Sequence, residues 1–169
     1  MADPTTKTKS LRELIQSAQV LVDKLGRLTH AGVAVVVAAA LDQLLEEALT
    51  TKLVHANRET RDKLFGEYGA LQTFSAKIDL SFALGVVDRK AYTNLTIIRK
   101  VRNCFAHADG FLDFDAPTVR KIFQPTPTKE PSTSPIDHFI GIAGEIETSL
   151  NATCELPSRG LIEKLKTEF

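Results

Sequence analysis

The chain has no excess of charge of one sign, few cysteines and no long apolar run, and each shortage excludes a class of protein. Twenty-one Lys and Arg residues balance twenty-one Asp and Glu residues, so any surface that binds a polyanion must be local. Two cysteines, Cys104 and Cys154, are too few for a disulfide framework and favour a reduced setting. The longest uncharged apolar run, Ala31 to Leu41, is about half of the roughly 20 residues that span a bilayer. Met1–Ser10 is too polar for a signal peptide, so we expect a soluble, cytoplasmic protein.

Proline is scarce in the first two thirds of the chain and frequent afterwards. Only Pro4 precedes Pro117 among the seven prolines, and proline is the residue that helix interiors tolerate least. The chain from Lys9 to Ala108 is therefore free to be helical. Four prolines fall within 124–135, where they predict an extended or partly disordered surface loop.

Apolar residues recur at helical spacing along most of the chain. The pattern predicts an amphipathic helix over 11–28 and a long central helix over 32–54, the first half of which we expect to be buried on all sides. Further helices are predicted around 60–65, from Thr73 or Ser75 to Gly85, from Asp88 to about His107, over about 136–154 and over 161–169. Because no segment shows strand alternation, the predicted fold is an all-α helical bundle. We expect one domain over 1–169, with a flexible N-terminus at 1–8 and a proline-rich loop at 124–135.

The most informative segment is LTIIRKVRNCFAH, at positions 95–107. On a helical wheel Arg102 falls within an inward stripe of four apolar residues, Ala91, Leu95, Ile98 and Phe105. A buried guanidinium is costly without a partner, so we expect Arg102 to have a carboxylate, a ligand or a subunit interface. Asp79, on an otherwise apolar helix, is the candidate carboxylate or a third polar member of a site.

Polar residues around Arg102 could line one edge of this helix. Asn103 and His107 are four residues apart and therefore neighbours on the helix surface. Arg99 and Lys100 add to a local basic charge in a neutral protein. One interpretation is structural: Arg102 pairs with an acid from a neighbouring helix, and His107 caps the last carbonyls. The other interpretation is a functional site.

Three blocks of sequence in this region resemble a known family. The run RNCFAH at 102–107 matches the Arg, four residues, His signature of the HEPN superfamily of helical domains. Together with LFGEYG at 64–69 and FSAKIDL at 74–80, it resembles the MltR family, a branch of HEPN-like proteins named for a mannitol-operon repressor. The similarity covers roughly 32–115. It implies an all-α bundle, often a homodimer, in which the Arg…His helix lies close to the subunit contact.

The resemblance implies two functions. The first is transcriptional regulation, as a repressor-type protein. No helix-turn-helix pair is visible and the net charge is zero, so we expect regulation through protein–protein contacts rather than direct DNA reading. The alternative is a metal-independent endoribonuclease in which His107 exchanges a proton with the RNA 2′-hydroxyl. Arg102 would then clamp the phosphate, while Asn103 would orient His107 or donate to the phosphate.

We expect no cofactor and no metal. Cys104 and His107 are three residues apart, but a structural zinc needs four ligands and no second pair is visible. The sequence also lacks a glycine-rich phosphate loop and a nucleophile elbow. Arg99, Lys100 and Asp79 are predicted binding or interface residues, and RNA is a partner only in the ribonuclease alternative.

Overall fold

The part of the chain that the structure describes is built from helices joined by turns and loops. A computed structural model describes all residues except 1–10, 56, 109, 124–133 and 155–169, and the side chains of 11–29 and 154 are outside the description as well. Its helices are α1 (Leu11–Lys52), α2 (Arg58–Phe65), α3 (Phe74–Ala83), α4 (Arg89–Ala106), α5 (Pro117–Phe123) and α6 (Pro135–Cys154). The described ranges contain no strand, which confirms the predicted all-α class. The predicted N-terminal tail at 1–8, most of the proline-rich loop and the helix over 161–169 lie outside the described residues.

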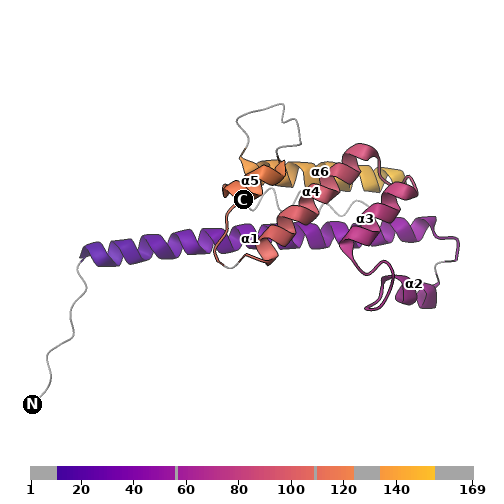
Figure 1. Cartoon of the computed structure of the whole chain (residues 1–169), viewed down its shortest axis with the longest axis horizontal. Helices are drawn as coiled ribbons and strands as arrows, with labels where there is room; N and C mark the ends of the chain where they lie inside the picture. Colours follow the sequence, from indigo (N-terminus) through magenta and orange to yellow (C-terminus); the bar gives the residue numbers. More distant parts are fainter. Residues whose placement is uncertain (1–10, 56, 109, 124–133, 155–169) are drawn as a thin grey trace, which may run out of the picture.

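Helix α4 is the central element of the bundle. Helices α1 and α6 run in the same direction, and α4 crosses them, while α3 returns beside α4 (Figure 1). Helix α4 packs against α1, α3, α5 and α6. The core between these helices is formed by fully buried apolar side chains, among them Leu41, Leu45, Leu49, Leu95, Ile98, Phe139, Ile146 and Leu150.

Local capping explains where the shorter helices begin and end. Thr73 accepts a hydrogen bond from Ala76 N at 3.2 Å and starts α3. Asp88 accepts one from Ala91 N at 2.7 Å and starts α4. Such side chains satisfy backbone N–H groups that the first turn of a helix leaves without partners. Gly85, with φ of 66°, turns the chain between the two helices in a conformation that favours glycine.

Three features of the fold differ from the predictions. Helix α1 runs without a break through residues 29–32, where we expected one helix to end and another to begin. Its central part is also not buried on all sides, because Val35 and Val36 are 45% and 50% exposed. A seven-residue helix, α5, follows the loop after α4 and was not predicted. Among the described helices, none is both long and apolar enough to cross a membrane.

Candidate functional site

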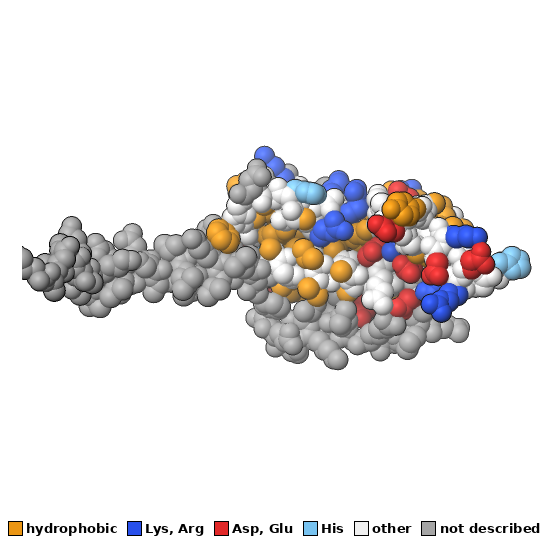
Figure 2. Space-filling view, turned by 90° about the horizontal axis from the view of Figure 1, so that it is seen from below, with side chains coloured by type: hydrophobic (Ala, Val, Ile, Leu, Met, Phe, Trp, Pro, Cys, Tyr) orange, Lys and Arg blue, Asp and Glu red, His pale blue; other side chains and the backbone are white. Residues whose placement is uncertain are grey.

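The predicted polar residues form one edge of α4 near its C-terminal end. Arg99, Arg102 and Asn103 are half-buried, whereas Lys100 and His107 are exposed. These five residues are called the α4 edge below. Figure 2 shows a face of the molecule on which Lys and Arg side chains border an apolar area, with acidic side chains farther along the same face.

The position of Arg102 corrects one prediction. The buried face of α4 includes Asn94, Ile97 and Val101, so its centre is turned away from Arg102, which is half-buried at the rim. The Arg102 guanidinium donates from Nη1 to Asn103 Oδ1 at 2.9 Å. Within the described residues no carboxylate forms an ion pair with Arg102. Of the three partners expected for a buried Arg102, the carboxylate is not found among the described residues, and the half-buried guanidinium is bonded to a neighbouring amide instead.

Asp79, which we considered as a partner of Arg102 or as a third polar member of the site, lies against Tyr92. It is exposed, and its Oδ1 accepts a hydrogen bond from the Tyr92 hydroxyl at 3.0 Å. This bond to a carboxylate raises the pKa of Tyr92, because loss of the phenolic proton would place two negative charges side by side. Asp79 thus ties α3 to α4, and the Arg102–Asp79 pair does not form.

The end of α4 is held in place by an aromatic cluster. His107 is the C-cap, and its backbone N–H donates to Asn103 O at 3.1 Å. In the following loop, buried Phe114 packs against Phe105 and Phe139 at ring-centroid distances of 4.9 and 5.1 Å. Its backbone N–H also donates to Nδ1 of His30 in α1 at 3.4 Å. The exposed His107 therefore lies at a helix end that the Phe114 cluster holds in place.

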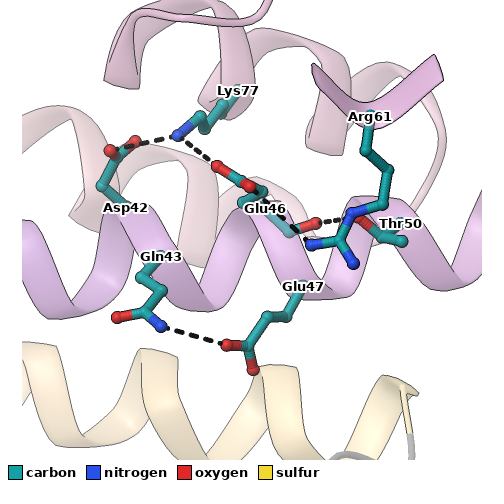
Figure 3. Close-up of polar contacts among 7 residues, drawn as sticks. All are labelled: Asp42, Gln43, Glu46, Glu47, Thr50, Arg61 and Lys77. Atoms are coloured by element: carbon teal, nitrogen blue, oxygen red, sulfur yellow. Dashed lines mark hydrogen bonds and ion pairs between the residues drawn. The ribbon is translucent and has the colours of Figure 1, made fainter. Parts of the chain in front are cut away.

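A second polar cluster, which sequence analysis missed, lies between α1, α2 and α3 (Figure 3). The Lys77 ammonium is 3.1 Å from Asp42 Oδ2 and 3.0 Å from Glu46 Oε2. The Lys77 side chain is only 5% exposed, while the two carboxylate side chains are 31% and 28% exposed. Arg61 of α2 approaches Glu46 at 3.9 Å. The cluster joins three helices through a lysine that enters the protein interior.

The sequence did contain a signal for this cluster. Lys77 occupies the inward stripe of α3 together with Phe74, Ile78 and Ser81, all of them buried. Asp42 and Glu46 are four residues apart, as two acids that share one cation on a helix surface would be. A lysine in an apolar stripe predicts a carboxylate partner by the same reasoning that we applied to Arg102.

A pocket of about 520 Å³ lies between α1 and α2, away from the α4 edge. Its lining residues are Glu46, Arg58, Arg61, Asp62, Phe65 and Gly66. None of them was a predicted site residue. The wall combines two arginines with two acids, so the pocket offers no surplus of one charge to a ligand.

Neither a metal-binding group among the described residues nor a matching protein helps to define the candidate site. In the described ranges, no group of three or more His, Cys, Asp or Glu side chains could hold a metal ion. Cys104 carries a free thiol and is half-buried. The chain matches no protein-family model, no curated protein and no solved structure. The resemblance to the MltR family therefore stays a prediction.

Proposed function

We propose that the chain is a cytoplasmic regulator of the MltR type that acts through protein contacts, and that the α4 edge binds an acidic surface of its partner. The observation that carries this proposal is that the cations of the α4 edge lack carboxylate partners among the described residues. In the part of the chain that the structure describes, Arg99, Lys100 and Arg102 form no ion pair with a carboxylate. Unpaired cations grouped on a neutral protein favour a partner of opposite charge.

Packing holds the α4 edge in place before a partner binds, which supports its use as a preformed binding surface. Helix α4 packs against four other helices, and the Phe114 cluster anchors its end. The hydrogen bond to Asn103 restricts the Arg102 side chain before any partner arrives, which lowers the entropy cost of binding. The neutral net charge of the chain favours a protein partner over DNA. As in the family that it resembles, we expect the protein to act as a homodimer.

A metal-independent endoribonuclease is the second candidate, favoured by the exposed His107, which lies one helical turn after Asn103, the residue to which Arg102 donates. His107 would take the proton from a 2′-hydroxyl, whose oxygen attacks the adjacent phosphorus and expels the 5′-oxygen of the next nucleotide, which takes a proton from water as it leaves. The Arg102 guanidinium would stabilise the negative charge that develops on the phosphate. For this step Arg102 must exchange its bond with Asn103 for one with the phosphate.

An RNA-cleavage assay distinguishes the two candidates. We expect that neither the purified wild type nor His107→Ala cuts RNA in the presence of a chelator, and that both melt at the same temperature. His55→Ala is the matched control, because His55 is also exposed but lies in the loop after α1. Cleavage by the wild type and by His55→Ala, but not by an equally stable His107→Ala, would establish the ribonuclease instead.

A further inference from the structure

The outward face of α1 carries an apolar stripe that the bundle does not cover. The inward residues of the middle of α1, among them Val33, Val37 and Leu41, are almost fully buried. On the opposite side Gly32, Val35 and Ala39 are exposed. A Cβ built on Gly32 would meet no atom within 4 Å, so the space in front of Gly32 is open.

The exposed residues continue a seven-residue repeat that begins at the start of the helix. Apolar residues or glycine recur with alternating steps of three and four, at Leu11, Leu14, Ala18, Leu21, Leu25, Leu28, Gly32, Val35 and Ala39. We call these nine positions the outer stripe. The helical path of α1 is continuous over all of them, and a repeat of this period keeps its positions along one side of a helix. An apolar repeat sustained over about four heptads is typical of a coiled coil.

The position of α1 in the fold shows why its own bundle leaves this stripe open. Its first half extends beyond the other helices of the described bundle (Figure 1). The second half packs inward on α3, α4 and α6, and the described members of the outer stripe, Gly32, Val35 and Ala39, are exposed. Most helical stability in proteins comes from packing an amphipathic face against something else. We therefore expect the outer stripe to pack against a partner helix.

We propose that the outer stripe is the interface of a homodimer in which the α1 helices of two copies pair antiparallel as a coiled coil. The sequence of the stripe favours this direction. With a two-fold axis near position 23, the layers join positions 11 with 35, 14 with 32, 18 with 28 and 21 with 25. Within these four layers each small residue meets a large one, because Gly32 faces Leu14 and Ala18 faces Leu28. Ala39 lies outside the paired layers. Facing large against small fills a layer evenly.

A parallel pair would be packed less evenly. Gly32 would face Gly32, Ala18 would face Ala18 and Ala39 would face Ala39, so thin layers would alternate with layers of paired leucines. In the antiparallel pair, the projecting half of each α1 also covers the exposed Gly32 and Val35 of the other copy. The proposal involves no residue of the α4 edge. It places the contact of the expected homodimer on α1, whereas the resemblance implies a contact close to α4, and binding of an acidic partner at the α4 edge does not depend on it.

The first test measures the oligomeric state of the full chain by sedimentation equilibrium. We expect a dimer for the wild type at micromolar concentration. Val35→Glu and Leu25→Glu should each raise the dissociation constant at least about 100-fold, because they place an unpaired charge in a desolvated layer. Leu84→Glu is the matched control: Leu84 is 47% exposed, close to the 45% of Val35, but lies at the end of α3. A monomeric wild type would overturn the proposal, and so would a dimer that both stripe variants leave intact.

The second test reads the direction of pairing by disulfide trapping. In a Cys104→Ser, Cys154→Ser background, Leu14→Cys chains mixed with Gly32→Cys chains should form a mixed disulfide dimer under mild oxidation. Neither variant alone should cross-link to itself. Self-linking of Leu14→Cys, without the mixed product, would show a parallel pair and overturn the proposed arrangement. Melting curves of both variants check that the fold is intact.

Discussion

Replacing Phe114 by alanine is expected to lower the free energy of unfolding by about 3–5 kcal/mol, the usual cost of removing a buried phenylalanine. Phe114 is 1% exposed and lies at the centre of a cluster that joins α1, α4 and α6. Its removal would leave a cavity between three helices. Because a domain of this size is stable by only about 5–15 kcal/mol, the effect should be the largest of any single change discussed above.

Urea unfolding followed by circular dichroism measures this loss. Phe111→Ala is the matched control, because it removes the same side chain three residues earlier, where the ring is 49% exposed. We expect the control to lose a small fraction of what Phe114→Ala loses. Similar losses for both would contradict the anchoring role of Phe114 at the end of α4.

Replacing Lys77 by methionine is expected to lower the free energy of unfolding by about 2 kcal/mol. Breaking a fully buried ion pair costs more than this, but Asp42 and Glu46 are 31% and 28% exposed and stay partly hydrated. Methionine keeps most of the volume of the side chain. The loss therefore reports chiefly the repulsion and the desolvation of two carboxylates that no longer share a cation.

Two further variants separate the charge effect from packing. The triple variant Lys77→Met, Asp42→Asn, Glu46→Gln should regain most of the lost stability, because buried ionic groups can often be replaced by neutral ones at little cost. Lys63→Met removes an exposed lysine paired with Glu59 at 2.7 Å and should change stability by no more than about 0.5 kcal/mol. If the triple variant were no more stable than Lys77→Met, the loss would arise from packing rather than from charge.

Features that depend on neighbouring residues in the chain were predictable. Asp88 and Gly85 act within one helical turn of their own position, so the start of α4 and the turn after α3 were predictable from residue types. The start of α3 was left between Thr73 and Ser75, and the structure has Thr73 as the cap. The break expected after position 28 was wrong, because Gly32 and the residues around it continue a helical period. A glycine inside a helix costs only about 1 kcal/mol, which packing of the rest of α1 offsets.

Features that depend on how helices face one another were harder to predict. The helical wheel gives the angle of Arg102 relative to Ile98 and Leu95. It does not show where the buried face of α4 is centred, because that depends on the other helices packed on α4. Val101 therefore occupies the inward position and Arg102 the rim. The Asp79–Tyr92 bond likewise depends on the crossing of α3 and α4. Helix α5 is too short for its periodicity to be distinguished from a turn.

The most direct test of the proposed function separates the synthesis of transcripts from their decay in cells. Pulse-labelled RNA should be compared between cells that carry the wild-type chain, an Arg99→Glu, Arg102→Glu variant, and Lys63→Glu as an exposed control outside the α4 edge. We expect the edge variant to change the synthesis rate of a defined set of transcripts while their half-lives stay constant, with Lys63→Glu behaving as wild type. Longer half-lives at unchanged synthesis rates, in cells where both variants accumulate normally, would contradict a regulator and support a ribonuclease.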